Sequence, residues 1–520
     1  MPQGATHPEN PSKNKGAEHD VPSPPLDLRH LETETEHADR WSSIRIMYFT
    51  VFLMSLGFSI VITGVWPYLH QLDRHATKEF MGLVVAAHPF AQMLFSPLVG
   101  WWGNKLGRIR IPLLCTVSIF ILASAVYSSI EVFPTYRKYW MITARLFVGV
   151  SSANMALCRS YVSAATKLEE RTRAVSMISL AQLLGFIVGP GLQAAVTPLG
   201  DDGYVIIKDR LTLNMYTAAG WINVLLGIVN FVLVLPRFFQ EKSIAAKEVM
   251  LLSSAATEKD AWKQVKPDYV SAWTLIVAFF IFTFNFVLLE SLGAAVTMDQ
   301  FAWSNKQALS YLGVLLSVGG LMACVVSAFI DKICKRFGEV RVLLYGGFLL
   351  MVLGRVSCIP FGTDPPKINY KNATQFGNGT EVEELGCPVD QEWCLTTPAM
   401  TLNQFLVGFA LTCIGYPIGI SLIQALFSKT LGPRPQGVWM GLITGSGCLS
   451  RVFGPVFVVY IYTNLGTIWT FGTTAFMMVI GMLWFKIVSK RLTRSCIEAM
   501  SISKLETKPD IEMTEFIAEL

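Results

Sequence analysis

The chain has 520 residues, of which 52% are hydrophobic and only 15% are charged. In soluble domains about a quarter of all residues are charged. The composition therefore argues against a soluble enzyme and predicts a protein with many membrane spans. The net charge of +5 is small and its basic residues lie in short segments between apolar runs, which argues against nucleic-acid binding. The sequence has no nucleophile elbow, no P-loop and no His or Cys cluster at metal-ligand spacing, so we predict no enzyme activity, cofactor or metal.

The N-terminal segment is rich in Pro, Ser and charged residues and has no apolar core. It therefore does not have the pattern of a cleavable signal peptide. We predict that residues 1–43 form a disordered cytosolic tail and that the first span acts as the signal anchor.

Apolar runs of about 20 residues, long enough to cross a bilayer as helices, recur through the rest of the chain. They predict an all-α membrane protein with twelve spans in two sets of six, a first half at 44–236 and a second half at 270–488. A polar linker at 237–269 separates the halves, and a cytosolic tail follows at 489–520. The expected spans are 44–69, 80–101, 111–130, 139–165, 174–199, 213–236, 270–297, 307–330, 340–361, 398–427, 436–463 and 466–488.

The segment GWWGNKLGRIR at 100–110 is a basic turn between two of these runs. Short loops rich in Lys and Arg stay in the cytosol, so this turn fixes the orientation. Loops on the same side carry further basic residues, and we predict that both termini are cytosolic. The residues of the turn that we expect to matter are Gly100, Asn104, Lys105, Gly107, Arg108 and Arg110.

The segment 362–397 is the one long loop assigned to the opposite, non-cytosolic side. It holds two N-glycosylation sequons, at Asn372 and Asn378, which we predict to be modified. It also holds Cys387 and Cys394, which an oxidising compartment would allow to pair.

Ionisable residues inside spans are costly, so each is a candidate for a solute or ion pathway, against the alternatives of snorkelling or a structural ion pair. Arg159 and Arg451 lie deep in their spans and could present positive charge to an anion. Glu290 is the carboxylate well inside the seventh span, where a dry site would favour its protonation. It suits proton coupling or a gate.

Three further residues are weaker candidates. Arg145 lies near the outer end of its span, where function and snorkelling are equally supported, and snorkelling is favoured for Arg355. His88 is the single histidine inside a predicted span, and it fits either a proton relay or a hydrogen bond within the bundle.

Two glycine–proline segments predict close helix packing or hinges. Gly185, Gly189 and Pro190 lie in the fifth span, and Gly454 and Pro455 lie in the eleventh. Glycines let a partner helix approach, and proline removes one backbone hydrogen bond.

The turn at 100–110, the run GFIVGPG at 185–191 and the six-plus-six layout resemble the major facilitator superfamily of transporters. Asn104 stands where that family more often has Asp. The segments RSYVSAAT at 159–166 and LGPRPQGVWMGLITGSGCLSRVFGP at 431–455, with others, resemble a lysosomal member more closely. That resemblance implies a glycosylated endolysosomal membrane protein with a chloride conductance, although no acidic dileucine sorting signal is visible in the N-terminal tail.

Two hypotheses for function stay open. In the first, the chain conducts chloride, with Arg159 and Arg451 attracting the anion and Glu290 gating. In the second, it is an alternating-access transporter that moves a small solute together with protons through Glu290. A scaffold without transport is a third and weaker hypothesis, because intramembrane charges argue against it.

Overall fold

The computed structural model describes residues 32–504, except positions 63, 75, 201–202, 208–210, 253–266, 363, 367–369, 377–378, 389–390 and 433. Eleven helical segments of this described part are long and apolar enough to cross a membrane. The last of them, within α17 (Gly437–Lys504), contains two helices, because Gly466 has non-helical dihedral angles of φ 84° and ψ −171°. The twelve expected spans are therefore all present.

The first half is formed by long helices with short connections. Its spans are α1 (Glu34–Ile62), α3 (Lys78–Leu106), α4 (Arg110–Ser128), α5 (Arg137–Ser152) with α6 (Asn154–Ala164), α7 (Leu168–Val196) and α8 (Met215–Val234). Between them lie α2 (Val65–Leu72), the 3-10 turns Ile130–Val132 and Thr197–Leu199, and the antiparallel strands β1 (Tyr204–Ile207) and β2 (Leu211–Leu213).

The second half repeats this pattern after a short linker helix, α9 (Ala245–Leu252). Its spans are α11 (Tyr269–Phe301), α12 (Asn305–Phe337), the series α13 (Glu339–Arg341), π-helix Val342–Leu349 and α14 (Leu350–Ser357), then α16 (Leu402–Leu431) and α17. The loop before α16 contains the antiparallel strands β3 (Tyr370–Phe376) and β4 (Gly379–Leu385) and the short helix α15 (Trp393–Thr396).

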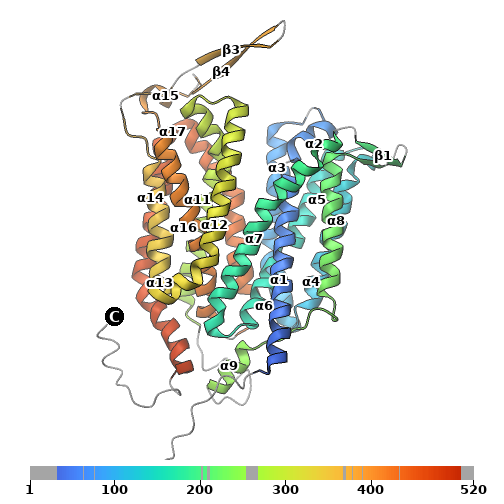
Figure 1. Ribbon diagram of the computed structural model, residues 1–520, viewed down its shortest axis with the longest axis vertical. Coiled ribbons are helices and arrows are strands. Elements are labelled where there is room, and N and C mark those ends of the chain that lie inside the picture. The colour runs from blue at the N-terminus through green and yellow to red at the C-terminus, as the bar shows by residue number, and fades with distance from the viewer. Residues whose placement is uncertain are drawn as a thin grey trace, which may run out of the picture.

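Figure 1 shows the two helical bundles side by side, with α9 at one end of the molecule and the β3–β4 hairpin at the other. We call these the α9 end and the hairpin end. The backbones of the two halves approach closely toward the α9 end, where a Cβ on Gly100 of α3 would lie 2.1 Å from the Gly437 carbonyl oxygen of α17. Glycine is required at both positions for this approach.

Glycines also set the packing inside each half. A Cβ on Gly185 or Gly189 of α7 would collide with α1, where the Ser59 hydroxyl donates to the Gly185 carbonyl at 3.0 Å. Gly454 of α17 packs against Val287 of α11. The expected packing role of these glycines is thus observed, and α7 and α17 continue as helices through Pro190 and Pro455.

Two sequence expectations need correction, and a third holds with an addition. The tail predicted as disordered over 1–43 is helical from Glu34, since Arg40 is anchored by Glu32 and Glu170. The turn predicted over 100–110 is confined to Gly107–Ile109, because α3 continues to Leu106 and Gly107 ends it at φ 63°. The all-α prediction holds for the spans, and two small β-hairpins are added to it in the loops.

The loop at 362–397 keeps its predicted cysteine pair together. Cys387, just after β4, and Cys394 of α15 form a disulfide. Asn372 lies in β3, and Asn378 lies outside the described residues.

Candidate functional site

A cavity of about 80 Å³ lies between the two halves. A volume of this size holds several water molecules or a small ion. Helices of both halves contribute to its wall, so a change in how the halves meet changes the cavity. Its lining consists of Met54, Ser55, Phe58, His88, Gln92, Ser152, Met155, Arg159, Gln182, Phe186, Phe279, Thr283, Tyr416, Ile420, Gln424, Thr444, Gly447, Cys448 and Arg451.

Arg159 of α6 is 5% exposed and joins the two halves. Its Nη1 donates to the Thr444 hydroxyl of α17 at 2.9 Å, and its Nη2 donates to Gln182 Oε1 of α7 at 2.7 Å. Its Nε is buried and has no hydrogen-bond partner. Both partners are neutral, and no ion pair of the described residues includes Arg159, so its charge is left uncompensated beside the cavity.

Arg451 of α17 reaches the same cavity from the second half and is half-buried. Its guanidinium lies over the Phe186 ring, 5.3 Å from the ring centroid. Tyr416 and the carboxylate of Glu290 both act electrostatically on its charge. The two arginines that the sequence singled out are therefore brought together on one cavity.

His88 of α3 also lines the cavity. Its Nε2 lies 3.0 Å from the Ser152 hydroxyl, and its ring packs against Phe58 with centroids 4.5 Å apart. These contacts agree with the expected hydrogen bond within the bundle. The positive charges of Arg145 and Arg451 both act on this histidine.

Arg145 does not line the cavity, and snorkelling is wrong for it, because the side chain is only 1% exposed. Its guanidinium lies over the ring of Phe58, a residue of the cavity lining, at 5.2 Å from the ring centroid. The Nε and Nη2 atoms are buried without hydrogen-bond partners.

Glu290 is exposed, which contradicts the expectation of a dry carboxylate site. It is not part of the cavity lining, although Phe279 and Thr283 on the same helix are. The spacing of 279, 283, 286 and 290 places it on the same face of α11, farther toward the hairpin end. It therefore lies beside the cavity and within electrostatic reach of Arg451.

Neutral polar residues of the cavity were missed by the sequence analysis. Gln182 and Thr444 hold Arg159, and Gln92 donates from Nε2 to the Ser152 carbonyl oxygen at 3.1 Å. Gln424 and Tyr416 complete this polar lining. Their signal in the sequence is a glutamine inside an otherwise apolar span, which is costly unless it binds a partner.

At the α9 end, Asn104 replaces the expected acid in contacts between the halves. Its Oδ1 accepts a hydrogen bond from the Gly437 amide at 2.9 Å, and its Nδ2 donates to the Pro435 carbonyl at 3.4 Å. A carboxylate could accept from that amide but could not donate to that carbonyl. The asparagine thus fits both partners.

The rest of the basic turn contacts its own half. Lys105 lies over the Trp101 ring at 5.0 Å. Arg110 Nη2 donates to the Phe239 carbonyl at 2.6 Å, and its backbone amide donates to Glu241 at 2.8 Å, which ties the linker to α4. Arg108 is exposed.

The linker helix α9 docks on the same end. Glu248 accepts from the Leu168 amide at the start of α7 at 3.1 Å, and burial raises the pKa of this carboxyl despite the nearby charge of Arg171. Arg171 Nη1 reaches the Ser428 carbonyl of the second half at 3.5 Å. Within the second half, Lys429 pairs with Glu339 at 2.6 Å, and Glu339 accepts from Thr172 of the first half.

The described residues contain no group of three or more His, Cys, Asp or Glu side chains that could hold a metal ion. The candidate site is a small cavity between the two helical bundles, and two arginines line it. Hydrogen bonds join the two halves at the α9 end.

The family model of the Major Facilitator Superfamily matches residues 47–368. The chain belongs to the major facilitator superfamily. It is 40% identical over 480 residues to major facilitator superfamily domain-containing protein 8 of Xenopus laevis, an alignment that covers 89% of this chain and 94% of that protein. Proteins of this superfamily are membrane transporters and not enzymes.

Solved structures of transporters of this superfamily share the fold at low sequence identity. The proton:xylose symporter XylE superposes with a TM-score of 0.64 at 12% identity, covering 87% of this chain and 96% of that one. The human organic anion transporter MFSD10 superposes with a TM-score of 0.59 at 18% identity, covering 86% of this chain and 99% of that one.

Proposed function

We propose that this major facilitator protein moves small anions, with chloride as the first to test, through the cavity that Arg159 and Arg451 line. The observation that carries the proposal is the uncompensated charge of Arg159, whose side-chain partners are Thr444 and Gln182. A buried charge without a counter-charge is costly, and an anion entering the cavity offsets that cost.

The shape of the cavity supports a small cargo. Its volume of about 80 Å³ is far below the ~300–1,000 Å³ of drug-sized ligand pockets. Gln182, whose Oε1 accepts from Arg159, also brings a side-chain amide nitrogen to the cavity that can donate to an anion.

The test is anion flux in proteoliposomes that contain the purified wild-type protein. Chloride current that reverses at the chloride equilibrium potential, and that persists without a pH gradient, supports passive anion conduction. Absence of any anion movement, with or without a pH gradient, contradicts the proposal.

A second candidate is proton-coupled transport of a small solute, and the position of Glu290 favours it. This carboxylate is exposed beside the cavity and acts on the charge of Arg451, so its protonation would change the field at the site. Glu290→Gln is expected to abolish the dependence of transport on the pH gradient, whereas the exposed Glu392→Gln is the matched control. Coupling that survives Glu290→Gln overturns this candidate.

We further propose that the protein resides in the endolysosomal membrane with both termini in the cytosol. The basic residues of the α9 end and the sequons at Asn372 and Asn378 in the opposite loop support this orientation. The test is glycosidase treatment of the wild type and of Asn372→Gln and Asn378→Gln, with protease protection of tagged termini in lysosomes. Protected termini, or an unglycosylated hairpin loop, contradict the orientation.

A further inference from the structure

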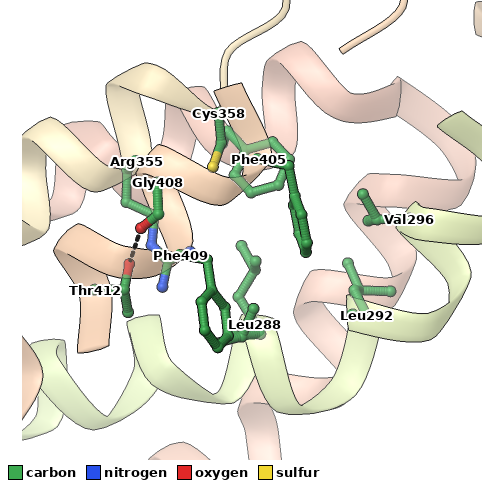
Figure 2. Close-up of a pocket in the computed structure, with 12 residues that line it drawn as sticks. Leu288, Leu292, Val296, Arg355, Cys358, Phe405, Gly408, Phe409 and Thr412 are labelled. Atoms are coloured by element: carbon green, nitrogen blue, oxygen red, sulfur yellow. Dashed lines mark hydrogen bonds between the residues drawn. The ribbon is translucent and has the colours of Figure 1, made fainter. Parts of the chain in front are cut away.

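A second buried pocket lies inside the second half, apart from the central cavity. Helices α11, α14, α16 and α17 form its wall (Figure 2). The lining is almost wholly apolar, with Arg355 as its single charged member. It consists of Leu288, Leu289, Leu292, Gly293, Val296, Arg355, Cys358, Phe405, Gly408, Phe409, Thr412 and Phe471.

Arg355 is 2% exposed, so the snorkelling favoured from sequence is wrong for it. Its Nη2 donates to the Asn285 carbonyl oxygen at 2.7 Å, and its Nε is buried without a hydrogen-bond partner. In Figure 2 the guanidinium lies beside Phe409 at one side of the pocket, and Leu292 and Val296 face it from the other side.

No carboxylate compensates this charge among the described residues, since none of their ion pairs includes Arg355. The groups that act on it electrostatically are the thiols of Cys358 and Cys413. The hydroxyl of Thr412 donates to the Gly408 carbonyl at 2.8 Å, so its hydrogen is already used. The guanidinium is therefore a buried cation with one backbone partner.

Such a cation cannot relieve its burial by losing a proton, because the guanidinium stays protonated in proteins. An uncompensated buried charge costs several kcal/mol. The described residues supply no counter-charge, so a bound anion would offset this cost, and the pocket limits its size. The centre of a water-sized particle can move within about 10 Å³ of this pocket, which leaves room for a single small ion and excludes carboxylates and phosphates with organic bodies.

We propose that this pocket binds one halide ion, chloride in the cell, as a fixed counter-ion of Arg355. The site is separate from the central cavity and shares no lining residue with it. It does not depend on the transport proposed above. Its ion neutralises the second half from within, while ions that cross the membrane meet Arg159 and Arg451.

The first test uses the wild-type protein with bromide in place of chloride. We expect an anomalous diffraction peak in the pocket, in contact with the Arg355 guanidinium. A pocket that holds only water at saturating bromide, with Arg355 well ordered, overturns the proposal.

The second test measures thermal unfolding in sodium chloride against sodium gluconate at equal ionic strength. Halide should raise the melting temperature by about 2 °C or more, since a ligand of the folded state stabilises it. Arg355→Met should lose this chloride-specific rise, whereas Arg336→Met, on the exposed face of α12, should keep it. An equal rise in both variants overturns the site. If Arg355→Met does not fold, the bromide measurement on the wild type still decides.

Arg159→Gln separates the two proposals. It should keep the bromide peak at Arg355 while losing anion flux. If the wild type shows no anion flux, the transport proposal fails, but the bromide peak at Arg355 is still expected. Each proposal can therefore fail without the other.

Discussion

Two buried arginines of the first half, Arg40 and Arg159, show opposite ways of handling the same charge. Arg40 is 1% exposed and binds Glu32 through Nε at 2.8 Å and Nη2 at 2.7 Å, and Glu170 through Nη1 at 2.9 Å. Arg159 is 5% exposed, and its side-chain partners are Gln182 and Thr444. The charge of Arg40 is compensated by carboxylates and joins α1 to α7, whereas the charge of Arg159 is not compensated and acts on the cavity.

The difference separates a buried charge that serves structure from one that we propose to serve transport. A guanidinium with two carboxylates has little field left for a third partner, whereas one with neutral partners attracts any anion that arrives. Arg451 is intermediate, because Tyr416 and the exposed Glu290 both act on it. The proposed anion transport therefore rests mainly on Arg159.

The largest expected effect is on stability. Arg40→Met removes the cation that Glu32 and Glu170 share, leaves Glu32 with Lys167 and His37 as its remaining ion-pair partners, and should lower the free energy of unfolding by about 3 kcal/mol. Arg159→Met removes a buried charge that has no counter-ion, so it should leave that free energy unchanged or raise it. Denaturant titrations of both variants in the same detergent measure the contrast. Equal losses in the two variants would erase the distinction between the arginines.

The next effect concerns the contact between the two halves. Arg159 of the first half binds Thr444 of the second half, so its burial depends on the halves lying together. In Gly100→Ala the new Cβ would lie 2.1 Å from the Gly437 carbonyl oxygen, so the halves cannot meet at the α9 end. We expect transport to fall about tenfold or more, which corresponds to 1.4 kcal/mol against the closed state. A cysteine that replaces Asn104 reports on this closure, because Asn104 contacts Gly437 across the α9 end. It should be alkylated faster in the Gly100→Ala variant than in the wild type.

Gly472→Ala is the matched control for that variant, because its Cβ would meet nothing within 4 Å. It should transport and be alkylated like the wild type. If Gly100→Ala also behaves like the wild type, then closure at the α9 end is not part of the cycle.

The smallest effect is a pH dependence confined to the Arg40 network. Burial alone would raise the pKa of Glu32, but hydrogen bonds from Arg40 and His37 lower it to about 2 from the ordinary 4.5. The stability that this carboxylate contributes is therefore complete above about pH 4.5 and is lost as the pH falls toward 2. Glu32→Gln should lower the melting temperature by about 2 °C at pH 7.

That gap between Glu32→Gln and the wild type should narrow as the pH falls below 4.5. The exposed Glu34→Gln is the control and should match the wild type throughout. A gap that stays constant down to pH 3 would show that the Glu32 charge does not stabilise the fold.

The sequence predicted the fold well because span length and hydrophobicity depend on local composition. All twelve spans and the two halves are in place, and Arg159 and Arg451 do line one cavity. Depth and exposure depend on kinks and neighbours that local composition does not reveal. Arg145 and Arg355 were therefore placed too near the surface, and Glu290 was placed in a dry site although it is exposed.

Long-range pairing explains the other misses. Residues 34–43 were predicted to be disordered, yet Arg40 binds Glu170, 130 positions later in the chain. Gln182 and Thr444 matter because Arg159 donates a hydrogen bond to each of them. The sequence of the span that contains Gln182 or Thr444 does not show this partner. Such partners become visible only when the halves are assembled.

The measurement that tests the central claim most directly is chloride flux through Arg159→Gln in proteoliposomes, with Arg336→Gln as the exposed control. Both variants lose one positive charge, and only the first loses it at the cavity. The account predicts a loss of at least about tenfold for Arg159→Gln, equal to 1.4 kcal/mol, with an unchanged melting temperature and normal flux in the control. Wild-type flux in a correctly folded Arg159→Gln would contradict it.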